Sequence, residues 1–189
     1  MKYHTQLPSS ALRRRMASRL LTLLLGTAWL AAGMPSAQAQ DSARPAPQVA
    51  PIFAAKGVTA SGQPLDLARY RGRVVLVLYW STDCAVCLDK LPELRANAAG
   101  WKGMPFAVVG INLDKRRADW ERYEQVSATT LPPDQRIPSI WGPGTEVLSF
   151  QPTAEHLPTA LLIDKEGRVV RRYEGRIPAQ AWDDIADLI

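Results

Sequence analysis

The feature that most constrains this chain is a pair of cysteines separated by two residues, Cys84 and Cys87, the only cysteines in the sequence. An apolar run, residues 74–80, ends shortly before them, and residues 88–99 carry apolar side chains at helical spacing directly after them. This order predicts a buried strand followed by a helix that begins at Cys84. Unpaired backbone N–H groups and the helix dipole stabilise an anion at that position. A thiolate of Cys84 is therefore favoured and nucleophilic.

Two other uses of paired cysteines fit the sequence less well. A structural zinc site usually takes four protein ligands, and beyond residue 39 the chain offers only these two thiols and one histidine, His156. A structural disulfide across so short a loop stabilises by about 2 kcal/mol in the chain-entropy model, against about 3 kcal/mol for a fifteen-residue loop. The pattern therefore favours a redox-active dithiol.

Residues 1–39 predict a secretory leader. Its apolar stretch, residues 20–32, is followed by small residues, and we expect cleavage after Ala39. The stretch is shorter than the roughly 20 residues that span a bilayer, so an uncleaved membrane anchor is the less favoured alternative. The basic residues that precede or open the stretch are Lys2, Arg13, Arg14, Arg15 and Arg19.

The net charge of +5 comes from this predicted leader. The whole chain has 23 basic and 18 acidic residues, and residues 1–39 hold five of the basic ones and no acidic ones. The remainder is nearly neutral, which gives no electrostatic reason to expect a nucleic acid or an anionic membrane as partner. Residues 40–51, rich in Ala, Pro and Gln, predict a flexible lead-in, and residues 52–189 are long enough for one domain.

The rest of the chain alternates strand and helix patterns. The strand, helix, strand order of residues 73–112 predicts a right-handed crossover between two parallel strands. Residues 131–152 are rich in Pro and Gly and contain one short apolar segment, residues 147–150. The expected strands and hairpins are residues 58–65, 73–80, 106–112, 159–163 and 168–173, and the expected helices are residues 84–99, 118–125 and 178–189. The predicted fold class is α/β, a central mixed β-sheet with helices on both faces.

Four segments in this order resemble the thioredoxin fold, and in particular the exported thiol-disulfide reductases of the TlpA, ResA and CcmG type. Together they cover most of residues 53–176. The segments are the lead hairpin with residues 67–72, the strand of residues 74–80, the two cysteines followed by Leu91-Pro92, and Leu157-Pro158-Thr159 ahead of residues 162–164. The resemblance implies a thioredoxin fold with an N-terminal β-hairpin extension.

The resemblance also implies roles for individual residues. Cys84 is then the attacking thiolate and Cys87 the resolving thiol, and the two form the redox disulfide. The Leu157–Pro158 peptide bond is expected to be cis and to lie against the dithiol, and Trp80 is expected at the rim of the site. The residues expected to bind substrate or shape the site are Trp80, Leu157, Pro158 and Thr159.

The chain departs from the family pattern beside the cysteines. Asp83 replaces a Trp or another apolar residue, and its charge should raise the pKa of Cys84. Lys90 stands where the family often has a glutamate. It either lowers the pKa of Cys87 as a nearby cation or is simply solvated on an exposed helix face.

The function implied by the resemblance is a periplasmic thiol-disulfide oxidoreductase. It would reduce disulfides of exported proteins, as in cytochrome c or metal-site maturation, with a membrane thiol protein as electron donor. We expect a monomer that needs no cofactor and no metal. An alternative is a thioredoxin-fold copper chaperone that uses Cys84, Cys87 and His156, although such proteins generally space their cysteines by three residues. A thiol peroxidase fits less well, because Val77 and Ser81 stand where peroxiredoxins carry Pro and Thr.

Overall fold

The computed structural model describes residues 52–147 and 152–189. The predicted leader (1–39) and lead-in (40–51) lie outside these residues, as does most of the apolar segment 147–150. Within the described ranges, no helix combines the length and the apolar character that crossing a bilayer requires.

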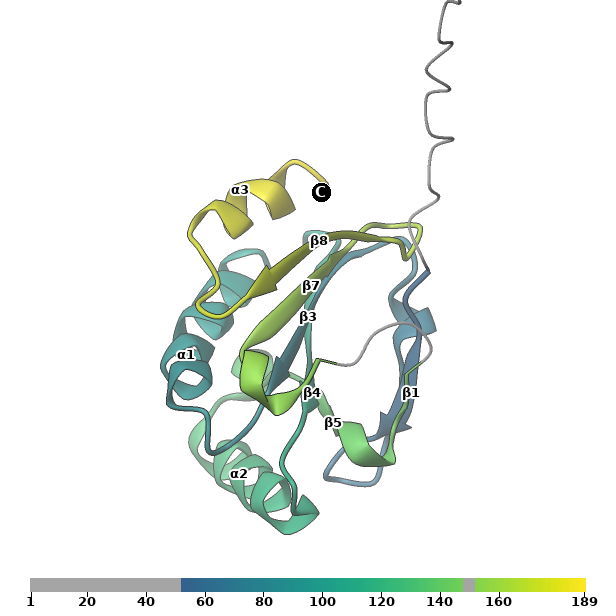
Figure 1. Cartoon of the computed structure of the whole chain (residues 1–189). Helices are drawn as coiled ribbons and strands as arrows, with labels where there is room; N and C mark the ends of the chain where they lie inside the picture. Colours follow the sequence, from purple (N-terminus) through teal and green to yellow (C-terminus); the bar gives the residue numbers. More distant parts are fainter. Residues whose placement is uncertain (1–51, 148–151) are drawn as a thin grey trace, which may run out of the picture. The chain divides into compact units, whose positions relative to one another are not determined.

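A mixed five-stranded sheet forms the centre of the fold, with the strand order β5-β4-β3-β7-β8 (Figure 1). Strands β3, β4 and β5 are parallel, whereas β7 is antiparallel to both β3 and β8. This arrangement confirms the predicted parallel pair and the predicted C-terminal hairpin. The strands are β3 (Val74–Trp80), β4 (Phe106–Asn112), β5 (Ser139–Trp141), β7 (Thr159–Ile163) and β8 (Val169–Glu174).

The expected N-terminal hairpin is present as part of a second sheet. Strands β1 (Ala55–Val58) and β2 (Pro64–Asp66) pair antiparallel, and β6 (Glu146–Val147) adds to the other edge of β1. A 3-10 turn, η1 (Leu67–Tyr70), follows β2. This layer covers one face of the central sheet, where alternate residues of β3 pack against it. The residues in this contact include Val75, Val77 and Tyr79 of β3 with Phe53, Ala55, Leu65 and Leu67.

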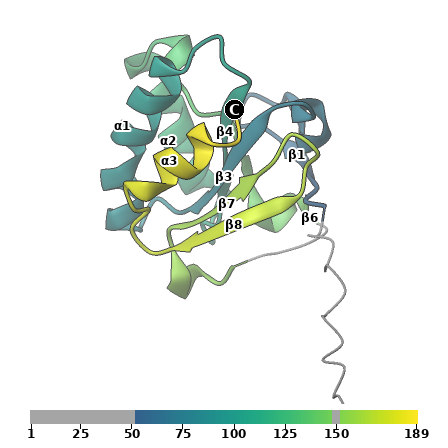
Figure 2. The same cartoon turned by 90° about the horizontal axis from the view of Figure 1, so that it is seen from above.

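All three described α-helices cover the opposite face (Figures 1 and 2). They are α1 (Ala85–Gly100), α2 (Arg117–Thr130) and α3 (Gln180–Ala186). The other side chains of β3 face them, and the shared core includes Leu76, Leu78 and Trp80 with Leu91, Leu94, Trp120, Ala181 and Ile185. The fold class is confirmed, but the prediction of helices on both faces is wrong.

The direction of the crossovers explains this difference. The chain moves from β3 to β4 and then to β5, which are successive neighbours in the sheet. Because such parallel crossovers are right-handed, two steps in the same direction place α1 and α2 on the same face. Helix α3 joins them, and its Trp182 contacts Trp101 edge-on with ring centroids 5.9 Å apart. The strand pattern alone does not reveal this direction of travel.

Two helix boundaries also differ from the prediction. Helix α2 continues beyond the expected residues 118–125 to Thr130, and α3 ends at Ala186, before the expected residue 189. The end of α2 is stabilised by Arg136, which donates to the carbonyl groups of Ala128 and Leu131. A helix C-terminus leaves such carbonyls without partners inside the helix, so an arginine just beyond the helix can extend it by donating hydrogen bonds to them.

Candidate active site

The two cysteines lie where β3 gives way to α1. Cys84 is the residue that caps α1, and its sulfur accepts a hydrogen bond from the backbone N–H of Cys87, 3.1 Å away. The backbone N–H of Leu88 also donates to the Cys84 carbonyl, at 3.1 Å. The first turn of the helix therefore directs an N–H group at the Cys84 sulfur, which stabilises a thiolate there.

Cys84 and Cys87 are joined by a disulfide. The two residues differ in their environments, since Cys84 is partly exposed whereas Cys87 is 0% exposed. Only Cys84 can thus meet a macromolecular disulfide without rearrangement of the helix. This asymmetry fits an attacking thiol at Cys84 and a resolving thiol at Cys87.

The Leu157–Pro158 peptide bond is cis, as the resemblance implies. Pro158 is buried, and Leu157 packs against the cores on both faces of the sheet. Thr159 is fully buried at the start of β7, and its hydroxyl donates to the carbonyl of His156 at 2.6 Å. Thr159 therefore shapes the cis-proline segment from inside and is not available for contact with a substrate.

Trp80 does not lie at the rim of the site, where we expected it. It is the last residue of β3, is 2% exposed, and contacts Tyr123 of α2 with ring centroids 4.8 Å apart. The reason is that even-numbered residues of β3 face the helical layer, so that Trp80 belongs to the core beneath the site. Its contribution is to the packing that supports the loop before Cys84.

Asp83 directly precedes Cys84 in the sequence and is exposed. Its carboxylate accepts a hydrogen bond from the Ser81 hydroxyl. None of the ion pairs among the described residues involves Asp83. The residue that precedes Cys84 is thus an acidic side chain without an ion-pair partner among the described residues.

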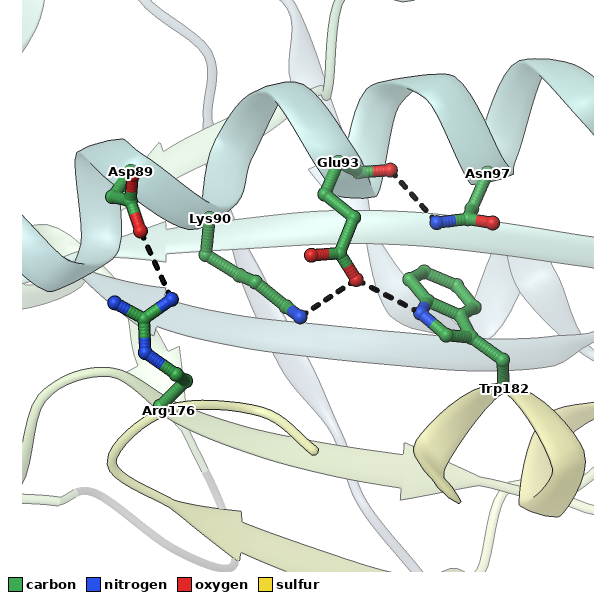
Figure 3. A network of polar contacts seen from close by, with 6 residues as sticks. All are labelled: Asp89, Lys90, Glu93, Asn97, Arg176 and Trp182. Atoms are coloured by element: carbon green, nitrogen blue, oxygen red, sulfur yellow. Dashed lines mark hydrogen bonds and ion pairs between the residues drawn. The ribbon is translucent and has the colours of Figure 1, made fainter. Parts of the chain in front are cut away.

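Lys90 is buried, being 5% exposed, which excludes the alternative of a solvated side chain on an exposed face. Its side chain runs along α1, and Nζ donates to Oε1 of Glu93 at 2.6 Å (Figure 3). Trp182 of α3 donates its indole N–H to the same oxygen at 3.1 Å. A lysine stem is long enough to be covered by protein while its ammonium reaches a carboxylate near the surface.

These two hydrogen bonds affect the pKa of Glu93. The hydrogen bond from Lys90 holds the pKa of the Glu93 carboxyl below its ordinary value, despite an opposing effect of burial. Asp89, also on α1, forms a second ion pair with Arg176 at 3.0 Å, and both of these side chains are exposed (Figure 3). Exposed ion pairs contribute little to stability, so we expect the Lys90–Glu93 pair to contribute more to the free energy of unfolding than the Asp89–Arg176 pair does.

Asp114 is a site residue that the sequence analysis missed. It is 5% exposed, and its two carboxylate oxygens accept hydrogen bonds from Thr82, in the loop that leads to Cys84. A signal for it does exist in the sequence, because Asp114 follows the strand of residues 106–112. The carboxyl ends of neighbouring parallel strands meet at one edge of a sheet, which is where sites form in α/β folds.

The residues of the copper-chaperone alternative do not assemble into a ligand set. Among residues 52–147 and 152–189, no three His, Cys, Asp or Glu side chains are grouped closely enough to hold a metal ion. The ring Nδ1 of His156 instead lies 2.8 Å from the Thr153 hydroxyl.

Comparison with known proteins identifies the family. The model of the AhpC/TSA family matches residues 46–182, which is more than half of the chain. The chain belongs to the AhpC/TSA family.

Curated relatives of this AhpC/TSA protein include thiol-disulfide oxidoreductases. ResA of Halalkalibacterium halodurans is 20% identical over 128 residues, which cover 68% of this chain and 69% of ResA. ResA of Bacillus cereus is 23% identical over 114 residues, which cover 60% of this chain and 62% of ResA. The matched part is thus slightly less than two thirds of the length of the second relative.

Solved structures show the same fold. A thiol:disulfide interchange protein of the thioredoxin family from Chlorobium tepidum TLS has a TM-score of 0.58 and 21% identity, covering 74% of this chain and 95% of its own. A DsbF homologue from Corynebacterium diphtheriae has a TM-score of 0.56 and 21% identity, covering 74% and 86%. With its Cys84–Cys87 disulfide at a helix N-terminus, this AhpC/TSA protein is a thiol-disulfide oxidoreductase of the thioredoxin fold.

The Lys90–Glu93 pair predicts a pH-dependent contribution to stability. Because the folded-state pKa of Glu93 is lowered, the contribution is present above the unfolded pKa of about 4.3 and is lost as the pH falls through the folded value. We expect Glu93→Gln to lower the free energy of unfolding at pH 7 by about 1 kcal/mol or less, because solvent screens a side chain that is 46% exposed. Urea unfolding at pH 7 and pH 3 measures the difference, which should shrink at pH 3.

The matched control is Glu121→Gln, which removes the exposed Arg117–Glu121 pair of α2. It should change stability by less than about 0.5 kcal/mol at either pH. If wild type and Glu93→Gln differ by the same amount at pH 7 and pH 3, the described role of the pair is wrong.

Proposed function

We propose that this protein is an exported reductant that acts in the periplasm on disulfides of other exported proteins. The observation that carries the proposal is the disulfide between a partly exposed Cys84 and a fully buried Cys87 at the N-terminus of α1. Export is supported by the leader pattern of residues 1–39. Reductive chemistry is supported by the family resemblance to TlpA, ResA and CcmG proteins.

The exchange proceeds in two displacement steps. The Cys84 thiolate attacks one sulfur of the substrate disulfide, so that a mixed disulfide forms and one substrate thiolate leaves and takes up a proton. The Cys87 thiol then loses its proton and attacks the Cys84 sulfur, which releases the second substrate thiolate and closes the Cys84–Cys87 disulfide. Two electrons have moved to the substrate disulfide, and the two cysteine thiols, which are oxidised to a disulfide, supply both of them without a cofactor.

A further reductant must reopen the Cys84–Cys87 disulfide after each cycle. In an oxidising compartment we propose a membrane thiol protein as this electron donor. The proposed substrates are cysteine pairs of exported proteins, with cytochrome c or metal-site maturation as the type of pathway. The proposed acting form is a monomer without metal.

A peroxidase activity is disfavoured by the residues ahead of Cys84. Val77 lies buried within β3, and the Ser81 hydroxyl donates to Asp83. Neither residue is the Pro or the Thr that we expect at these positions in a peroxiredoxin.

The leader proposal predicts the N-terminus of the mature protein. Cleavage after Ala39 would make Gln40 the first residue. N-terminal sequencing of the protein recovered from a periplasmic extract checks this. A sequence that starts at Met1 on membrane-bound protein would instead establish the uncleaved anchor.

The direction of electron flow predicts a low reduction potential for the dithiol. Equilibration of the protein with dithiothreitol or glutathione buffers should give a value near that of thioredoxin, about −270 mV. A value near about −120 mV would mark an oxidase that installs disulfides and would reverse the proposed direction.

The same titration tests Asp83 and Lys90, the charged residues at which the chain departs from the family pattern near the cysteines in the sequence. Stabilising a thiolate stabilises the reduced form and raises the potential. Lys90→Met should therefore make the potential more negative, and Asp83→Asn should make it less negative. Lys102→Met is the control, since Lys102 is exposed and pairs with Asp134 away from the dithiol. Equal reduction potentials in Lys90→Met, Asp83→Asn and wild type would show that neither residue affects the reduction potential of the dithiol.

The assigned roles of the two thiols predict different phenotypes. Cys84→Ser should abolish reduction of a disulfide-bonded protein such as insulin. Cys87→Ser should instead accumulate mixed disulfides through Cys84, because the resolving step is lost. Mass spectrometry under non-reducing conditions detects the trapped species. Wild-type activity in Cys84→Ser would show that the assignment is incorrect.

A further inference from the structure

We propose that Asp114 is a positioning residue for thiol exchange, an inference that rests on the proposed function. Its Oδ1 accepts the backbone N–H of Thr82 at 2.7 Å, and its Oδ2 accepts the Thr82 hydroxyl at 2.9 Å. Thr82 lies in the loop between β3 and α1, two residues before Cys84. Asp114 therefore holds the loop that carries the attacking thiol.

Asp114 is itself fixed by the ends of two strands. Its backbone N–H donates to Oδ1 of Asn112 at 2.9 Å, and its carbonyl accepts the indole N–H of Trp141 at 2.8 Å. Asn112 ends β4 and Trp141 ends β5, and they are register partners of each other. Trp80, which ends β3, is the register partner of Asn112 on the other side. A carboxylate anchored on β4 and β5 thus restrains the loop that leaves β3.

This restraint matters most in the reactive states. In the oxidised protein the disulfide itself keeps Cys84 beside Cys87. In the dithiol and in the mixed disulfide that bond is absent, and noncovalent contacts must hold Cys84 where the Cys87 N–H reaches its sulfur. Local hydrogen bonds hold part of the loop: the Cys84 N–H donates to the Ser81 carbonyl at 3.3 Å, the Leu88 N–H donates to the Cys84 carbonyl at 3.1 Å, and the Ser81 hydroxyl donates to Asp83. The Asp114–Thr82 pair adds a contact to a residue 32 positions away in the sequence. Loss of Asp114 should therefore weaken thiolate formation at Cys84.

Substitutions at Asp114 separate positioning from charge. Asn has the same shape: its oxygen can accept from the Thr82 N–H, and its amide can donate to the Thr82 hydroxyl oxygen. Ala removes both contacts as well as the charge. If the charge were the important property, Asn and Ala would both ease thiolate formation, because a nearby negative charge would be gone. If position is important, Ala impairs the thiolate and Asn does not.

A matched control is available in the turn between β7 and β8. Asp164 is also buried, and its carboxylate accepts from the backbone N–H and from Nε of Arg168, each at 2.8 Å. Asp164→Ala removes a comparable pair of hydrogen bonds away from the dithiol. It therefore reports the effect of lost stability alone.

The experiment measures two quantities on the reduced full chain, each corrected for the folded fraction seen by circular dichroism. The first is the rate of exchange with bis(2-hydroxyethyl) disulfide. The second is the pH midpoint of Cys84 alkylation by iodoacetamide in a Cys87→Ala background. The other charged or titratable groups on the segments that flank the dithiol are the same in all variants. They are Asp83 in the loop, Asp89, Lys90, Glu93 and Arg95 on α1, and Glu155 and His156 before the cis-proline.

We expect Asp114→Ala to slow exchange by about tenfold or more and to move the alkylation midpoint to higher pH, since small displacements of a reacting group cost large factors in rate. Asp114→Asn should stay within about threefold of wild type, and Asp164→Ala should change neither quantity. Thr82→Val, which removes only the hydroxyl contact, should shift the midpoint in the same direction by less. It supplies the test if Asp114→Ala does not fold.

The proposal is overturned if Asp114→Ala matches wild type, if Asn is as impaired as Ala, or if Thr82→Val leaves the midpoint unchanged. Failure of the proposed function has a different signature. In that case wild type itself would not reduce the disulfide, while the alkylation midpoint would still report whether Asp114 positions Cys84.

Discussion

The site depends on the burial of β3. All seven residues of this strand are buried, with β4 on one side and β7 on the other. Its alternate side chains enter two separate cores, one beneath the helices and one beneath the N-terminal sheet. A strand held on both edges and both faces cannot shift without breaking contacts throughout the domain. The loop that leaves it at Trp80 therefore starts from a fixed point, and Cys84 inherits that position.

The chemistry then arises from the different surroundings of two identical groups. Cys84 caps α1, where it meets solvent and a backbone N–H, whereas Cys87 lies one turn further, fully buried. Two acidic residues near Cys84 also differ in their exposure. Asp83, which directly precedes Cys84, is exposed, while Asp114 is buried and accepts two hydrogen bonds from Thr82 of the loop. The N-terminus of α1 thus exposes the attacking thiol and buries the thiol that resolves the mixed disulfide.

Lys90 shows how the fold accommodates a departure from the family pattern. A lysine where relatives of this type often carry a glutamate would place an unpaired charge within the protein, which is costly. Here the ammonium reaches Glu93, and the same carboxylate oxygen accepts the indole N–H of Trp182 (Figure 3). The hydrogen bond from Trp182 to Glu93 thereby links α3 to α1. Glu93, the partner that compensates the Lys90 charge, comes from the same helix. The second hydrogen bond to Glu93 comes from Trp182, near the C-terminal end of the sequence.

The sequence by itself determined the local features of this protein. The continuous apolar run predicted β3 and the apolar spacing after Cys87 predicted α1, because these signals depend only on neighbouring residues. The thioredoxin fold was predicted from the resemblance of four ordered segments to a known family. Tertiary structure decided what depends on partners distant in sequence. The crossovers placed all three helices on one face, Trp80 was buried by Tyr123, and Asp114 met Thr82 across 32 residues. Such contacts follow from the order of strands in the sheet, which no local pattern encodes.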